Sequence, residues 1–186
     1  MRLFVALEIP TAVRESLAAL LQSLRTISSQ PRWVRPENLH VTLKFIGQWP
    51  AEKLDTLRGT LAAVRLDKPV ALDFRGLGFF PDEKRPRVFW AGIAASPNLV
   101  TLASEIETVT EKLGIPREQR EFSPHLTLAR FEPPGLPEKL RAAIQENSAR
   151  DFGSLNTSQF HLIESKLKPS GAEYTTLQTF PFAAEA

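Results

Sequence analysis

The sequence contains no cysteine, only three histidines and no long hydrophobic run. Without cysteine the chain forms no disulfide, has no thiolate nucleophile and builds no cysteine-ligated zinc or iron–sulfur centre. The histidines are spread far apart, so we expect no metal site and no cofactor. No stretch approaches the ~18 apolar residues that a membrane helix requires. The apolar run within Met1–Pro10 is too short for a signal peptide, and we expect a cytoplasmic protein.

The composition is that of an ordinary globular protein. Hydrophobic residues make up 42% and charged residues 24% of the 186 residues, which is enough apolar material for a core. The length fits one domain or two small lobes. Lys and Arg number 23 against 21 Asp and Glu, so the chain is no polycation that binds nucleic acid by charge alone.

The chain repeats itself once. A buried strand expected at Leu3–Ile9 recurs 85 residues later at Val88–Ala94, and each is followed by an amphipathic helix. Each helix leads through a polar loop to a short strand that begins with a histidine. Beyond these strands the spacing becomes 86 residues, so that Phe74 corresponds to Phe160. Each half therefore reads as strand, helix, strand, helix, strand.

This pattern predicts an α+β fold in one domain, residues 1–186, made of two pseudo-symmetric lobes. We expect two antiparallel sheets that line a central cleft, with the helices outside. Thr11 and Ser96, each next to a proline, are the expected N-caps of the first helix in each half.

The two histidine strands carry matching motifs, His-Val-Thr-Leu at residues 40–43 and His-Leu-Thr-Leu at residues 125–128. Side chains alternate across a strand, so each histidine and its threonine share one face while the apolar residues face the core. The same alternation places Lys44 on the open face. Two imidazoles with a pKa near ~6.5 can act as general acid and general base, and threonine hydroxyls can donate to a phosphoryl oxygen. The paired motifs therefore indicate metal-independent phosphodiester cleavage.

These motifs resemble the paired His-x-Thr-x motifs of the two-histidine (2H) phosphoesterases, in particular the RNA 2′,3′-cyclic phosphodiesterase branch, also called the 2′-5′ RNA ligase or LigT family. The resemblance covers nearly the whole chain, including Arg2–Leu7, Leu43–Gly47, Pro124–Arg130 and the tail from Glu164 to Tyr174. It implies a bilobal fold with both motifs in a central cleft. It also implies hydrolysis of RNA 2′,3′-cyclic phosphate ends to 2′-phosphomonoesters without metal or nucleotide cofactor.

Carried over residue by residue, the resemblance assigns a role to five side chains. His40 is the proton donor to the leaving 3′ oxygen, and His125 is the base that activates water. Thr42 and Thr127 hold the non-bridging phosphoryl oxygens, and Arg130 binds phosphate. Strict alternation places Arg130 on the face opposite His125, so the strand must end or twist before it.

Other functions remain open at this point. With an RNA 5′-hydroxyl in place of water, the same histidines would join two RNA ends through a 2′-5′ bond. A small cyclic nucleotide phosphate is an alternative substrate. A non-catalytic module that binds RNA or nucleotides is a different class, and intact histidines in both motifs argue against it. We expect RNA ends as the partner, no membrane, no obligate protein partner and a monomer.

Further residues carry weaker signals. His161 has no threonine two positions on and is expected to be structural. The loop Lys84–Arg87, together with Lys44, is a candidate for contact with an RNA backbone, although a solvated loop explains it equally well. The aromatic residues that could stack on a base are Trp33, Phe79, Phe80 and Trp90, but Trp90 lies within an apolar strand and is expected in the core.

Overall fold

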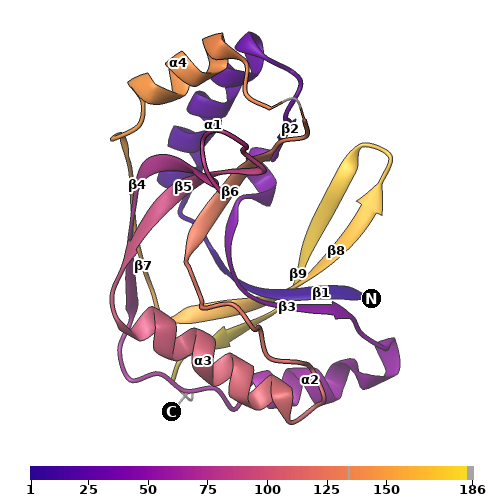
Figure 1. Ribbon diagram of the computed structural model, residues 1–186. Coiled ribbons are helices and arrows are strands. Elements are labelled where there is room, and N and C mark those ends of the chain that lie inside the picture. The colour runs from indigo at the N-terminus through magenta and orange to yellow at the C-terminus, as the bar shows by residue number, and fades with distance from the viewer. Residues whose placement is uncertain (134, 184–186) are drawn as a thin grey trace.

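A computed structural model describes residues 1–133 and 135–183 (Figure 1). In these residues, strands and α-helices follow one another in the order β1 (Arg2–Glu8), α1 (Thr11–Ile27), β2 (Arg32–Trp33), β3 (His40–Gln48), α2 (Leu54–Leu61), β4 (Val70–Phe80), β5 (Val88–Ala95), α3 (Asn98–Glu111), β6 (His125–Arg130), α4 (Glu138–Glu146), β7 (Asp151–Thr157), β8 (Gln159–Lys168) and β9 (Gly171–Pro181). Short 3₁₀ helices, η1 (Pro36–Asn38) and η2 (Ala51–Lys53), precede β3 and α2.

The strands form two antiparallel sheets, which we call sheet A and sheet B. Sheet A has the order β3-β1-β8-β9, and sheet B has the order β2-β6-β5-β4-β7. The repeat is visible in the matching orders β3-β1-β8 and β6-β5-β4. The last strand of each copy is exchanged, because β4 from the first half joins β5, and β8 from the second half joins β1. The predicted α+β fold is confirmed, but each sheet combines strands from both halves of the chain.

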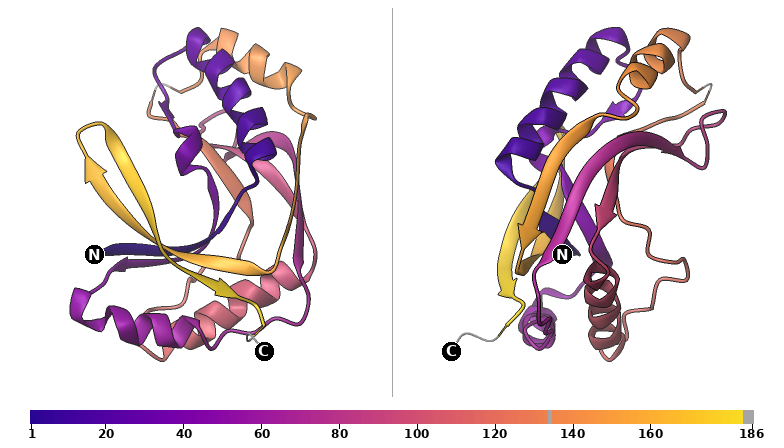
Figure 2. Two further views of the ribbon diagram at one scale, coloured as in Figure 1. Left: turned by 180° about the vertical axis from the view of Figure 1, so that it is seen from behind. Right: turned by 90° about the vertical axis from the view of Figure 1, so that its left-hand side faces the viewer.

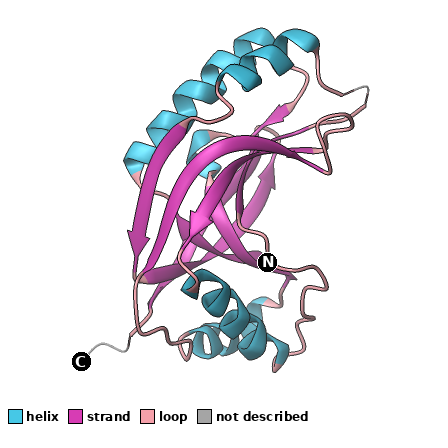
Figure 3. Cartoon of the chain, turned by 60° about the vertical axis from the view of Figure 1, so that its left-hand side comes forward, coloured by secondary structure: helices cyan, strands magenta, loops and turns pink. Residues whose placement is uncertain are grey.

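The helices gather in two groups at opposite ends of the molecule (Figures 2 and 3). Helix α1 lies beside α4 and packs on β7, whereas α3 lies beside α2 and packs on β3 and β4. Each repeat's first helix therefore covers strands of the other half. None of the described helices is both long enough and apolar enough to cross a membrane.

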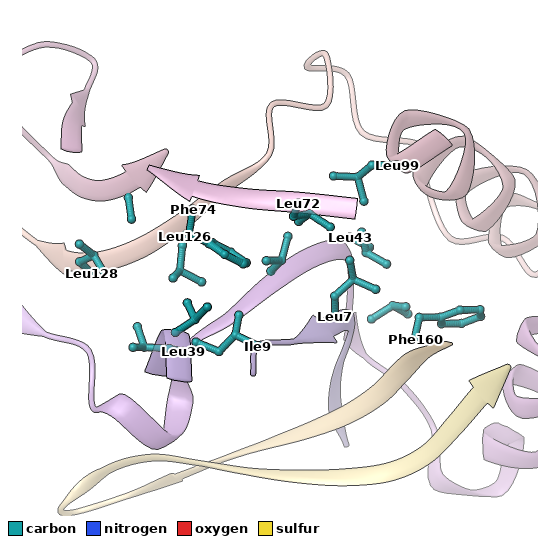
Figure 4. Packing of buried hydrophobic residues seen from close by; sticks show 14 of the residues in the cluster. Leu7, Ile9, Leu39, Leu43, Leu72, Phe74, Leu99, Leu126, Leu128 and Phe160 are labelled. Atoms are coloured by element: carbon teal, nitrogen blue, oxygen red, sulfur yellow. The ribbon is translucent and has the colours of Figure 1, made fainter. Parts of the chain in front are cut away.

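One hydrophobic core joins the two sheets (Figure 4). Leu7 and Leu43 of sheet A meet Leu72 and Leu126 of sheet B, and Leu99 of α3 closes one side. All five side chains are buried. The leucines of both motifs thus face the core, as alternation predicts, and the histidines lie outside it.

Two helix starts differ from the prediction. Helix α1 begins at Thr11 itself, with Pro10 in the N-cap position and no side-chain capping bond. Pro97 occupies the N-cap position of α3, and the Ser96 hydroxyl instead accepts a hydrogen bond from the backbone of β4. Proline fixes φ in the range that enters a helix, which explains why it stands at both starts.

Candidate active site

The two motif histidines begin two strands of different sheets. His40 is the first residue of β3 and His125 the first residue of β6. Cα atoms of these two strands come within 8 Å of each other, so the strands are neighbours although they lie in separate sheets. The fold therefore brings together the motif strands of the two halves. That the two His–Thr pairs face each other across a cleft stays a prediction.

Both imidazole rings are oriented in the same way. Nδ1 of His40 lies 2.5 Å from the carbonyl oxygen of Asn38, and Nδ1 of His125 lies 2.8 Å from that of Ser123. A carbonyl oxygen only accepts hydrogen bonds, so each Nδ1 carries a hydrogen and donates it. The lone pair of each neutral ring is then on Nε2. Each Nε2 can take up or give a proton.

His40 lies in an aromatic cluster on the face of sheet A that points away from the core. Its ring stacks on Phe4 with the centroids 4.6 Å apart and meets Tyr174 edge-on at 5.1 Å. Phe4 forms a small apolar cluster with Ala6 and Ile163, separate from the main core, and Tyr174 packs against it. Sequence reasoning assigned no role to Phe4 or Tyr174. Strand alternation could have placed Phe4 on the His40 face, because its neighbours Leu3 and Val5 face the main core.

Burial in this cluster changes the acidity of His40. Loss of hydration lowers its pKa from 6.5 to about 4, against the hydrogen bond to the Asn38 carbonyl, which raises it. The positive charge of the nearby Arg14 lowers it further. His40 of the unliganded chain is therefore neutral at pH 7.

The turn before His40 is tied to the β8–β9 hairpin. The Asn38 side chain and Arg35 donate hydrogen bonds of 2.9 and 3.1 Å to the carbonyl oxygen of Ala172. Asn38 thus orients His40 through its backbone and the hairpin through its side chain. This contact helps to place Tyr174, two residues further on, against the His40 ring.

On sheet B, aromatic side chains lie beside His125. The Phe80 ring meets the His125 ring edge-on at 5.0 Å and lies 5.4 Å from the Trp90 ring. Trp90 is half-buried and pairs across the strands with Thr127. The prediction that Trp90 belongs to the core is wrong. Its strand alternates, and its neighbours on either side, at positions 89 and 91, face the core instead.

The other predicted aromatic contacts divide between the two faces. Phe79 and Trp33 pack against the main core. The indole nitrogen of Trp33 donates to the carbonyl oxygen of Ser28, which fixes its ring. Of the four aromatic residues singled out from the sequence, Phe80 packs against His125 and Trp90 pairs with Thr127.

A β-bulge in β6 explains the position of Arg130. The pairing of β5 with β6 shifts by one residue after Thr127, and the next two side chains, Leu128 and Ala129, are both buried. A bulge inserts one residue and so reverses the alternation beyond it. The exposed Arg130 therefore lies on the same face as His125 and Thr127 while remaining within the strand.

An equivalent bulge in β3 buries Lys44. The pairing of β1 with β3 shifts after Thr42, and Leu43 and Lys44 both point inward. Lys44 is 2% exposed, and its ammonium lies 2.9 Å from Oε2 of Glu107 and 2.6 Å from the carbonyl oxygen of Pro116. The prediction that Lys44 lies on the open face and contributes to RNA binding is therefore wrong. It connects β3 to α3 and to the segment that leads into β6.

The rest of the predicted basic cluster is exposed. Lys84, Arg85 and Arg87 lie at the surface in the connection between β4 and β5. The Asp82 carboxylate accepts hydrogen bonds from the backbone N–H groups of Lys84 and Arg85, which shapes this turn. Both interpretations of the loop, RNA contact and solvated surface, fit this exposure.

His161 is buried in β8. Its Nδ1 lies 2.9 Å from the Thr179 hydroxyl and 3.9 Å from a carboxylate oxygen of Glu8. Burial lowers its pKa, and the Glu8 charge opposes that effect. A buried, hydrogen-bonded ring fits the structural role expected for this histidine.

Two surface pockets lie outside the motifs themselves. One, of about 160 Å³, is lined by residues around Pro31 and Glu132. The other, of about 490 Å³, lies between Phe45 of β3 and residues 115–120. Across residues 1–133 and 135–183, no group of three His, Asp or Glu side chains is arranged to hold a metal ion.

Comparison with known proteins agrees with this architecture. A family model described as LigT like Phosphoesterase matches residues 7–90 and again residues 93–174, the two copies of the repeat. The RNA 2′,3′-cyclic phosphodiesterase of Archaeoglobus fulgidus is 35% identical over 180 residues, which is 97% of this chain and 99% of that protein. The one from Thermus thermophilus is 36% identical and covers 100% of this chain and 92% of its own length.

Solved structures give the same result. The crystal structure of TT0787 of Thermus thermophilus matches with a TM-score of 0.82 at 32% identity over 100% of both chains. The crystal structure of E. coli LigT complexed with 3′-AMP matches with a TM-score of 0.75 at 26% identity over 98% of both chains. The family model and the full-length relatives together show that the chain belongs to the LigT-like phosphoesterase family.

Proposed function

We propose that the chain is an RNA 2′,3′-cyclic phosphodiesterase that opens the cyclic end to a 2′-phosphomonoester. The observation that carries this proposal is the matched setting of the two histidines. Each ring donates from Nδ1 to a backbone carbonyl, which leaves Nε2 for proton transfer, and the two rings begin neighbouring strands. The activity named for the full-length relatives supports the same reaction.

In the proposed reaction, Nε2 of neutral His125 accepts a proton from water as the water oxygen attacks phosphorus. The bond between phosphorus and the 3′ oxygen breaks, and Nε2–H of His40 gives its proton to that oxygen. The 2′ oxygen keeps its bond to phosphorus, so the product is a 2′-phosphate. The hydroxyls of Thr42 and Thr127 donate to the non-bridging oxygens as charge builds there, and the Arg130 guanidinium binds the phosphate.

The acid role of His40 requires a proton that the unliganded ring lacks at pH 7. A phosphate anion against Nε2 favours the charged form of the ring and raises its pKa. We therefore propose that His40 becomes the acid when substrate binds. Burial against Phe4 and Tyr174 strengthens this coupling, because charges interact more strongly where water is excluded.

The same groups support joining of RNA ends. If the 5′-hydroxyl of a second RNA replaces water, His125 takes its proton and a 2′-5′ phosphodiester forms while the 3′ oxygen leaves. We propose hydrolysis as the main activity, since water is always in excess. A monomer acting on RNA in the cytoplasm remains the expectation for its setting.

Product analysis tests the proposal. The chain is incubated with a short RNA that ends in a 2′,3′-cyclic phosphate, in EDTA and without nucleotide, and the new end is identified by its resistance or sensitivity to a 2′-phosphotransferase and a 3′-phosphatase. We expect a 2′-phosphate. A 3′-phosphate contradicts the proposed leaving group, and an unchanged RNA that the chain nevertheless binds indicates the non-catalytic module. A parallel reaction with a 5′-hydroxyl RNA measures joining.

A further inference from the structure

The β3 bulge brings an aromatic side chain to the His40 face. Phe45 follows the buried Lys44 in β3, as Arg130 follows the buried Ala129 in β6, and the spacing of 85 residues makes Phe45 and Arg130 equivalent in the repeat. At this position one half of the chain has a cation and the other half an aromatic ring. Phe45 is 58% exposed, so it contributes little to the core.

The Phe4 ring links Phe45 to His40, the proposed proton donor. The Phe4 ring lies 4.6 Å from the His40 ring and 6.3 Å from the Phe45 ring. The centroids of the His40 and Phe45 rings are therefore no farther apart than these two distances added together. A single exposed apolar residue is common on protein surfaces. This one extends an aromatic row that begins at the proposed proton donor.

Phe45 and Ile46 of β3 also line the pocket of about 490 Å³, and residues 115–120 make up the rest of its wall. Lys44 fixes that wall through its bond to the Pro116 carbonyl. Two arginines line the pocket. Arg117 is held by Glu111 at 2.8 Å, whereas Arg120 makes no ion pair within the residues that the structure describes.

The chemistry of this pocket suits a nucleotide. An exposed aromatic ring offers a stacking surface for a base, and the Arg120 guanidinium can pair with a phosphate. The Glu118 side chain also lines the pocket, so the lining is not uniformly basic. Stacking of a base on Phe45 therefore contributes more to binding than the pairing of Arg120 with a phosphate.

We propose that Phe45, Arg120 and this pocket form a subsite for the nucleotide that precedes the cyclic end of the RNA. The inference rests on the proposed function. Neither histidine lines the pocket, and the Phe45 ring is linked to the His40 ring through Phe4, so we place the pocket next to the reacting nucleotide and not at its phosphate. A 2′,3′-cyclic end has RNA only on its 5′ side. The subsite thus favours RNA strands over cyclic mononucleotides as substrates.

The test compares adenosine 2′,3′-cyclic phosphate with a diadenosine nucleotide that ends in the same cyclic phosphate. We expect Phe45→Ala to raise the KM of the dinucleotide about 10-fold, because stacking on an aromatic side chain contributes ~1–3 kcal/mol per base. The mononucleotide should keep its kcat and KM. Phe45→Trp should retain tight dinucleotide binding, and Arg120→Ala should raise the dinucleotide KM more weakly and reduce its dependence on salt.

Val100→Ala is the matched control, since Val100 is 56% exposed on α3 and is not among the residues that line the pocket. Thermal melting of each variant confirms that the fold is kept. The subsite is overturned if Phe45→Ala leaves both substrates unchanged, or raises the KM of both equally. Wild-type chain that hydrolyses neither substrate overturns the proposed function itself, whereas active wild type with no Phe45 effect overturns the subsite alone.

Discussion

At the scale of single residues, His40 and His125 hold the same position in their strands but have different aromatic neighbours. His40 is enclosed by Phe4 and Tyr174, and its pKa is lowered to about 4. The motifs assign both histidines and both threonines to the site from residue type and spacing, and this assignment stays a prediction. The sequence did not predict the enclosure of His40, since Tyr174 comes from a hairpin more than a hundred residues away.

The protonation of His40 should depend on a bound phosphate. In the free chain we expect a pKa of about 4 for this ring, so it is neutral at pH 7. Binding of the product-like anion adenosine 2′-phosphate places negative charge beside Nε2 and should raise this pKa by about two units or more. NMR titration of the imidazole signals, with His40→Gln to assign them, measures both values. A pKa that stays near 4 in the complex would refute His40 as the acid and favour it as the base.

At the scale of structural elements, the β-bulges decide which residues reach the site. Simple alternation placed Arg130 on the wrong face and Lys44 on the open face. Each motif strand carries an extra residue after its threonine. This bulge moves Lys44 to the core face and Arg130 to the face of the histidine. The residue types do not predict a bulge here, because Leu43-Lys44 and Leu128-Ala129 are equally compatible with a regular strand.

The buried contact between Lys44 and Glu107 makes a sharp prediction about stability. The Lys44 side chain is 1% exposed and that of Glu107 is 14% exposed. Lys44→Met leaves the carboxylate without its partner, and the free energy of unfolding should fall by about 3–5 kcal/mol. The double change Lys44→Met with Glu107→Leu should recover most of this loss, because neither charge is then buried alone. Urea denaturation of the three chains measures it. Equal losses for the single and double variants would contradict the account.

Two glycines offer a matched comparison within β4 and α2. A Cβ at Gly78 would overlap the Trp90 ring, whereas a Cβ at Gly59 meets nothing within 4 Å. Gly59→Ala should stabilise the chain by about 0.5–1 kcal/mol, since alanine is the better helix former. Gly78→Ala must displace Trp90 and should destabilise it by about 1–3 kcal/mol. Thermal melting compares them. If Gly78→Ala melts as high as wild type, Trp90 does not pack on Gly78 as described.

At the scale of the whole molecule, duplication explains how one motif yields a two-histidine site. The 85-residue spacing predicted the two copies and the α+β class, and the family model matches each copy. The exchange of β4 and β8 between the sheets was not predictable. Residue patterns identify strands but do not say which distant strand each one joins, and Phe74 and Phe160 suit either sheet.

The central claim is that His40 and His125 perform the proton transfers without metal. The most direct measurement is the turnover of an RNA 2′,3′-cyclic phosphate in EDTA by wild type, His40→Ala, His125→Ala and the control His161→Ala. Each motif change should lower kcat by roughly 10²–10⁴-fold, because one proton transfer then lacks its group. His161→Ala should keep kcat within a few-fold and lower only the melting temperature, since His161 is buried and bonded to Thr179. Near-normal kcat in either motif variant, or activity lost in EDTA and restored by a divalent ion, would contradict the account.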